Sequence, residues 1–224
     1  MYLLTFKLND YIKTYQFNND LEKLLFELKF YNLVFVIAGS EPGVELADLI
    51  ASNLNIETAN PIETREHRRD KFLMYQQLKN YHLMHISQFK SHKCSEIINW
   101  TKNRNFPLIA KPLKSAGGDK VRICYSVADV VDAFNQIVNK KPNVLNLFDD
   151  AILIQEYIDA PEIAVNTIQY NGNSYLNEIV QFHKKIVSNG KKIYDYATLI
   201  PFEKYGQGLI DYAFNVAKAL DIQY

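Results

Sequence analysis

The sequence has 224 residues, of which 48% are hydrophobic, and its 25 Lys and Arg residues balance 25 Asp and Glu residues. This composition excludes a disordered chain, and zero net charge argues against a protein held to nucleic acid by a general positive field. The longest apolar run, Leu33 to Ala38, is far shorter than the ~20 residues that cross a bilayer, so no membrane partner is expected. Two cysteines far apart in the sequence predict no disulfide scaffold. These features predict a soluble, cytoplasmic protein.

The first third of the chain alternates helical and strand-like segments. Leucines at helical spacing after Asp20 predict a helix over residues 21–28. The continuous apolar run Leu33 to Ala38 is typical of a parallel strand that is buried on both faces. A turn, Gly39 to Gly43, precedes a second helical pattern that extends to Leu54. This order is typical of βαβ units and predicts an α/β arrangement for this part of the chain.

A cluster of cations marks the start of the next predicted helix, Glu66 to Tyr81. Positive charge at a helix N-terminus opposes the helix dipole, which favours anions at that end. We therefore expect an anion to lie against these side chains. A further helix is predicted over residues 92–105. The clustered cations are Arg65, Arg68, Arg69 and Lys71.

A lysine at the end of a buried strand is the first candidate for chemistry. Residues 107–111 predict a strand that ends at Lys111, residues 114–120 form a turn rich in small residues, and residues 121–125 predict a second strand. A fixed cation beside flexible backbone N–H groups suits a polyphosphate. The alternative is an ordinary hairpin with a Gly-Gly turn and a lysine that reaches solvent.

The second half of the chain predicts an antiparallel sheet. Ser126 and Asp129 predict a capping box at the start of a helix that extends to about residue 139. Strand-like segments follow, and the dipeptide Asn171-Gly172 is typical of a tight hairpin turn, which requires antiparallel pairing. A final helix is predicted over residues 208–220. The predicted strands cover residues 151–158, 163–170, 174–183 and 193–200.

Two carboxylates in this half lie where a plain core would not place them. Glu156 ends an apolar strand, and Glu162 follows a short loop later. A carboxylate and the adjoining backbone can bind the amino group and ring nitrogens of adenine, while a second carboxylate can accept from ribose hydroxyls. The alternative is a pair of solvated loop acids. His82 and His85 lack a third ligand and predict no metal site.

In these segments the sequence resembles the ATP-grasp superfamily, and within it the carbamoyl-phosphate-synthetase-like and amino-acid-ligase branch. The resemblance extends from about Val34 to Tyr224 and depends on the order of several short motifs rather than on any one of them. The motifs cover residues 39–48, 68–74, 107–112, 115–119, 154–158 and 161–162.

The resemblance implies an ATP-grasp fold preceded by a partial Rossmann-like domain, that is, α/β followed by α+β. The first domain would cover residues 1–88 and the ATP-grasp domain residues 89–224, with a lid at about 89–151 and a larger part at about 152–224. By the same resemblance Lys71 and Lys111 bind phosphates and Glu162 binds ribose. The other implied ATP contacts are the glycine-rich flap residues Ser115, Gly117 and Gly118, and the adenine-binding residues Glu156, Tyr157 and Ile158.

The reaction implied by the resemblance is ATP-dependent ligation of a small carboxylate substrate to an amine through an acyl phosphate. The family usually holds Mg²⁺ with a Glu-x-Asn motif, which is expected after the helix 208–220 and would therefore lie beyond Tyr224. We accordingly assign no metal ligand and no catalytic residue, and interpret the chain as a fragment of a ligase that could form homo-oligomers. The alternative is a nucleotide-binding or interaction module without turnover. The sequence does not indicate which carboxylate or which amine is joined.

Overall fold

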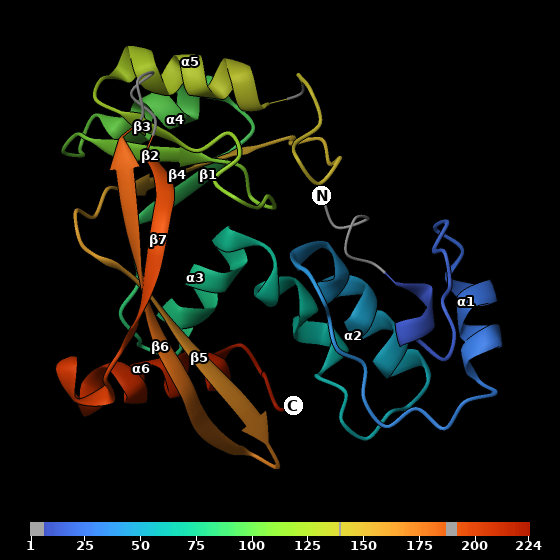
Figure 1. Ribbon diagram of the computed structural model, residues 1–224. Helices are drawn as coiled ribbons and strands as arrows, with labels where there is room; N and C mark the ends of the chain where they lie inside the picture. The colour runs from blue at the N-terminus through green and yellow to red at the C-terminus, as the bar shows by residue number, and fades with distance from the viewer. Residues whose placement is uncertain (1–6, 139, 187–191) are drawn as a thin grey trace.

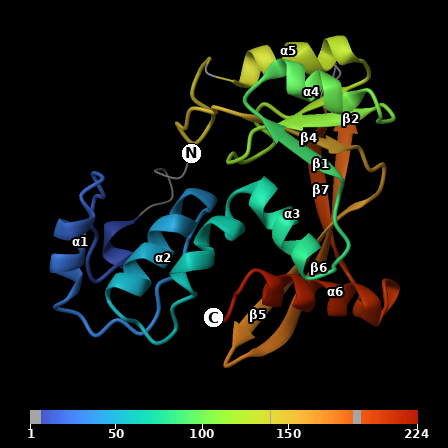
Figure 2. The same cartoon turned by 180° about the vertical axis from the view of Figure 1, so that it is seen from behind.

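Two antiparallel sheets, preceded by a helical segment, form the body of the molecule (Figure 1). The computed structural model describes residues 7–138, 140–186 and 192–224. Helices α1 (Leu21–Leu28) and α2 (Val44–Asn53) lie to one side, and α3 (Lys71–Asn80) lies between them and the sheets in both views (Figures 1 and 2). The short 3-10 helices of this part are η2 (Leu8–Asp10), η3 (Glu41–Gly43) and η4 (Ile62–Arg68).

The first two predicted helices are confirmed as α1 and α2. The carboxylate of Asp20 accepts a hydrogen bond from the backbone N–H of Lys23 at 3.0 Å, which satisfies one of the free donors at the start of α1. No residue of α1 is fully buried: its leucines are half-buried, Phe26 is 63% exposed, and Phe30, just after the helix, is 76% exposed. Propensity and capping therefore define this helix more than packing does.

The predicted buried strand Leu33 to Ala38 is wrong. These residues form an extended, irregular segment, and Ile37 within it is 82% exposed. A strand requires a neighbouring strand to pair with its backbone, and no strand of the described chain lies beside this segment. The Thr58 hydroxyl donates a hydrogen bond to the carbonyl of Val34 in this segment at 2.7 Å. The βαβ order is thus absent from the described residues.

The helix predicted to begin at Glu66 begins at Lys71, because η4 occupies the preceding residues and Asp70 caps the helix. The Asp70 carboxylate accepts from the backbone N–H groups of Phe72 and Leu73 at 2.8 and 3.0 Å. The anion expected at the helix start is therefore supplied by the chain itself. Two of the three arginines in this cluster also have partners, Arg68 with Asp48 and Arg69 with Glu41.

The first sheet has the order β1-β4-β2-β3, with every neighbouring pair antiparallel. Helices α4 (Cys94–Thr101) and α5 (Val127–Ile137) cover one face of it (Figure 1). Leu108 and Ala110 are fully buried against Ile97 of α4 and Val130 of α5. The predicted capping box is confirmed by Ser126. The strands are β1 (Gln88–Ser91), β2 (Leu108–Lys111), β3 (Arg122–Cys124) and β4 (Ile152–Glu156).

The second sheet contains β5 (Glu162–Tyr170), β6 (Asn173–Ile186) and β7 (Lys192–Ile200) in that order, all antiparallel. Asn171 and Gly172 have φ values of 49° and 73°, as expected for a tight hairpin turn that matches the twist of its strands. After the short helix η5 (Phe202–Lys204), α6 (Gln207–Ala219) lies beside β5 and β6 (Figure 2). The strand and helix predictions for this part are confirmed.

Candidate functional site

Strand β2 directs Lys111 away from the helix-covered face of the first sheet. Side chains alternate along a strand, and Leu108 and Ala110 point into the core under α4 and α5. Ile109 and Lys111 therefore face the other side of the sheet. Burial, and to a smaller extent the nearby positive charge of Lys71, lowers the pKa of Lys111 to about 8. Across the described chain, this ammonium group has neither a hydrogen-bond nor an ion-pair partner.

Lys71, the first residue of α3, approaches the same region from a different element. Its ammonium group donates to the carbonyl oxygens of Leu113 at 3.3 Å and Ser115 at 3.1 Å. The pKa of Lys71 is also lowered, first by burial and then by the charge of Arg69. Two half-buried cations, one of which lowers the pKa of the other, create a local excess of positive charge, which a bound anion would relieve.

The loop between β2 and β3 has an exposed tip and a buried stem. Ser115 in the stem is buried, and its hydroxyl donates to the carboxylate of Asp119 at 3.2 Å. Gly117 and Gly118 are exposed at the tip, with φ values of +63° and +76° that favour glycine. The hairpin alternative is correct in that β2 and β3 pair antiparallel. Lys111 is half-buried, as expected also for a lysine whose stem is covered while its ammonium group reaches solvent, so this part of the alternative stays open.

The far end of β2 meets Glu156. Leu108 pairs with Glu156 and Lys111 pairs with Leu153, so the two ends are three residues apart along the ladder. At the rise of an extended strand this separation is about 10 Å. Glu156 is exposed and borders a hollow of ≈ 340 Å³. The hollow is lined by residues 103–107 together with Glu156, Tyr157 and Ile158, so the three predicted adenine-binding residues lie together.

Phe106 also lines this hollow, and sequence reasoning gave it no role. It is half-buried immediately before β2 and packs against the core of the first sheet. On the opposite wall, Ile158 is 59% exposed and the hydroxyl of Tyr157 donates to Asp159 at 3.2 Å. Its role could have been inferred from its position, because Phe106 begins the same segment of sequence that carries Lys111.

Glu162, the first residue of β5, lies within a polar cluster on the second sheet. Its carboxylate accepts from the ammonium group of Lys184 and from the hydroxyl of Tyr194, the latter at 2.5 Å. Burial alone would raise the pKa of Glu162, but these two hydrogen bonds outweigh it and hold the pKa below its usual value. The hydrogen bond that Tyr194 donates to Glu162, together with burial, raises the pKa of Tyr194 to about 12. Neither Lys184 nor Tyr194 was identified from the sequence, since each meets Glu162 only through strand pairing.

No family model matches this sequence. It is 32% identical over 179 residues to dapdiamide A synthase of Enterobacter agglomerans, a match that covers 80% of this chain and 42% of that protein. Its fold matches the crystal structure of an L-amino acid ligase from Bacillus licheniformis with a TM-score of 0.70 and 18% identity, covering 90% of this chain and 46% of the other. The chain belongs to the amino-acid-ligase branch of the ATP-grasp superfamily.

The ATP-grasp fold is also that of D-alanine–D-alanine ligase from Bacillus anthracis complexed with ATP. That structure matches with a TM-score of 0.64 and 15% identity, covering 98% of this chain and 70% of the other. This ATP-grasp chain spans less than half of the length of dapdiamide A synthase and of the Bacillus licheniformis ligase.

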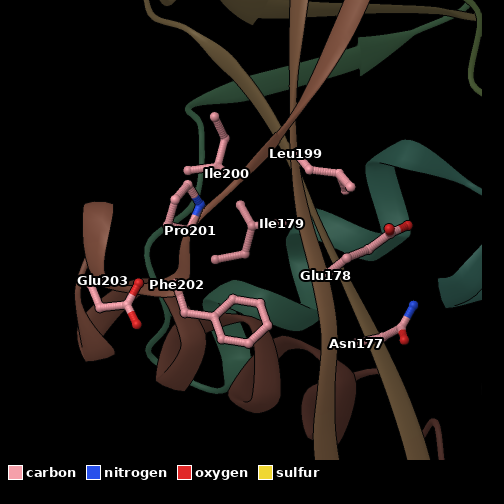
Figure 3. Close-up of a pocket in the computed structure, with 8 residues that line it drawn as sticks. All are labelled: Asn177, Glu178, Ile179, Leu199, Ile200, Pro201, Phe202 and Glu203. Atoms are coloured by element: carbon pink, nitrogen blue, oxygen red, sulfur yellow. The ribbon is translucent and has the colours of Figure 1, made fainter.

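A second hollow, of ≈ 510 Å³, lies where β7 ends beside β6 and contains none of the predicted site residues. Figure 3 shows Ile179 and Phe202 on one side of these strands, with Leu199 and Glu178 on the other. Its lining is mainly apolar and it lacks a cation. In this ATP-grasp chain the hollow at Glu156, with the two lysines beyond it, is therefore the better candidate for a nucleotide.

Metal ligands do not gather in the described part of this ATP-grasp chain: no three His, Cys, Asp or Glu side chains there are placed to hold an ion. None of the helices described is both long and apolar enough to cross a membrane.

Proposed function

We propose that this chain binds ATP along β2, with the triphosphate at Lys111 and Lys71 and the adenine in the hollow beside Glu156. The observation that carries the proposal is the pair of half-buried lysines, one of them unpartnered among the residues described, at one end of a strand whose other end opens into that hollow. The separation of about 10 Å leaves room for a ribose between base and phosphates. The exposed Gly117 and Gly118 would offer backbone N–H groups to the phosphates as a flap.

The base end of the proposed site combines apolar and polar groups. Phe106 and Ile158 provide apolar surface for a flat ring, while Glu156 and the backbone of Tyr157 and Ile158 provide polar atoms for the exocyclic amine and the ring nitrogens. Glu162 would accept from the ribose hydroxyls in exchange for one of its present donors, Lys184 or Tyr194. These assignments follow the resemblance.

We infer that the whole protein joins a small carboxylate to an amine at the expense of ATP. A substrate carboxylate oxygen would attack the γ-phosphorus while ADP leaves, and the amine would then attack the acyl carbon, lose a proton and release inorganic phosphate. Lys71 and Lys111 would offset the repulsion between carboxylate and triphosphate. Mg²⁺ supplies further charge neutralisation in such reactions. Among the described residues, no three His, Cys, Asp or Glu side chains are placed to hold it.

We further propose the domain division stated above: residues 1–88, a lid at about 89–151 and a larger part at about 152–224. β4 pairs within the sheet of the lid and leads toward β5, so the boundary between the lid and the larger part would lie after Glu156 rather than at residue 151, and the segment after Glu156 would act as the hinge. A cytoplasmic location agrees with the two free cysteines, Cys94 and Cys124. We also propose that the chain forms homo-oligomers, and sedimentation would measure its mass in solution.

Titration calorimetry with ATP tests the nucleotide site. Replacing the cation in Lys111→Met should weaken ATP binding at least about tenfold, because hydrogen bonds to charged groups contribute about 1.5–3 kcal/mol. Lys218→Met removes an exposed lysine from α6 and serves as the matched control, with no expected change. If the unmodified protein binds no adenine nucleotide, the proposal fails. Phosphate release from ATP in mixtures of amino acids then distinguishes a ligase from a binding module without turnover.

A further inference from the structure

The loop after α5 forms hydrogen bonds with both ends of the glycine-containing loop between β2 and β3. We call residues 143–149 the bracket loop and residues 114–120 the flap. Hydrogen bonds connect the two loops. They are made by the side chains of Asn143 and Asp149 on the bracket loop and of Asp119 on the flap. Asn143 and Asp149 are only 6% and 7% exposed, although both are polar. Buried polar groups of this kind require partners, and here the partners lie on the flap.

Asn143 uses both ends of its side-chain amide. Its Oδ1 accepts from the backbone N–H groups of Leu145 at 2.9 Å and Leu147 at 3.3 Å, which closes the bracket loop on itself. Its Nδ2 donates to the carbonyl oxygen of Lys114 at 2.7 Å, the first residue of the flap. One buried side chain therefore shapes the bracket loop and holds the flap at the same time.

The other end of the flap is held by three further contacts. The backbone N–H of Val144 donates to the carboxylate of Asp119 at 2.8 Å. Lys120 donates to the carbonyl of Lys141 at 2.6 Å and forms an ion pair with Asp149 at 3.3 Å. Between the two held ends, Gly117 and Gly118 are exposed, and a Cβ at either position would meet no atom within 4 Å. The stem is therefore fixed, whereas the side of the tip that faces solvent has no neighbour.

The flap stem is held from two opposite sides. The carbonyls of Leu113 and Ser115 accept from the ammonium group of Lys71, whereas the carbonyl of Lys114, the residue between them, accepts from Asn143. Successive carbonyls of an extended chain point in opposite directions, which allows the two donors to hold one short segment between them. Loss of the Asn143 contact would release the segment that orients Lys71.

We propose that Asn143 is a positioning residue for the triphosphate end of the site: by fixing the carbonyl of Lys114 it keeps Leu113 and Ser115 in place to orient Lys71. This inference rests on the proposed ATP-binding function. Asn143 itself touches no phosphate in this arrangement, so its effect is exerted through Lys71 and the flap.

Competition binding with ATP and AMP, performed on the full 224-residue chain, tests the inference. Asn143→Ala should weaken ATP about tenfold, since it removes one hydrogen bond to the flap and loosens others, and should leave AMP, which lacks the β and γ phosphates, within about twofold. Asp119→Ala, which removes the contact at the other end, should also weaken ATP selectively. The matched control Val144→Ala keeps the backbone N–H and should bind both nucleotides as before.

Thermal unfolding shows whether each variant is folded. If Asn143→Ala does not fold, the ATP and AMP affinities of Asp119→Ala test the inference. Equal weakening of ATP and AMP would mean that Asn143 has only a structural role, and unchanged ATP affinity in both variants would also overturn the inference. Failure of the unmodified protein to bind ATP would instead refute the proposed function. Hydrogen exchange at Gly117 and Gly118 should be faster in Asn143→Ala, because its stem is released.

Discussion

The low pKa of Lys111 predicts that ATP binding weakens as the pH rises from 7 to 9. With a pKa of about 8, the lysine is about nine-tenths protonated at pH 7 and about one-tenth protonated at pH 9. A triphosphate favours the protonated form and so raises this pKa in the complex. If only that form binds tightly, the dissociation constant should increase about tenfold over this range. The phosphates themselves, with a last pKa of about 6, change little there.

Calorimetry at pH 7, 8 and 9 in buffers of different ionisation enthalpy measures both the affinity and the proton uptake. Uptake should approach one proton per ATP at pH 9. Lys111→Arg supplies the control, because a guanidinium stays protonated over this range and the pH dependence should become shallower. A dissociation constant that changes less than about twofold between pH 7 and 9 would refute the assignment of Lys111 to the triphosphate.

Three other predictions follow from residues described above. The pKa of Lys111 in the folded protein lies below its unfolded value of 10.5. The free energy of unfolding of the nucleotide-free protein should therefore rise between pH 8 and 10.5, by up to about 3 kcal/mol. Urea unfolding measures this rise, which should be smaller in Lys111→Met. Arg68→Met should destabilise the fold by about 3–5 kcal/mol, because it leaves the carboxylate of Asp48 unpaired with only 8% of that side chain exposed; an unchanged urea midpoint would contradict this. Gly118→Val should weaken ATP binding without unfolding the protein, since a β-branched residue at φ +76° is strained by about 1–3 kcal/mol; if ATP affinity is retained, the tip is not part of the site.

The parts of the fold that were predictable are those with a local cause. The capping box at Ser126 and the turn at Asn171-Gly172 are specified by neighbouring residues, and both are present. The run Leu33 to Ala38 shows the limit, because apolar character alone does not supply a pairing partner. Strand β1 (Gln88–Ser91) was missed for the opposite reason, since its short sequence has little apolar alternation and it is held by β4.

Residues of the candidate site could be proposed from the sequence where their position in a strand or helix is itself unusual for their chemistry. Lys111 was recognised because a lysine ending a buried strand is unusual. The contact of Lys71 with the carbonyl of Ser115 joins residues 44 positions apart, and the contact of Asn143 with Lys114 joins residues 29 positions apart. Such pairings leave no local pattern in the sequence, which is why Asn143 had no predicted role.

The register of β2 also sets how this site can vary in length. Deleting or inserting one residue between Leu108 and Lys111 would turn the lysine into the core under α4 and α5, because alternate residues of a strand face opposite sides. The spacing between base and phosphate ends can therefore change only in steps of two strand residues. The exposed flap tip at Gly117 and Gly118 has no such constraint, so length variation among functional variants should collect there rather than in the strand.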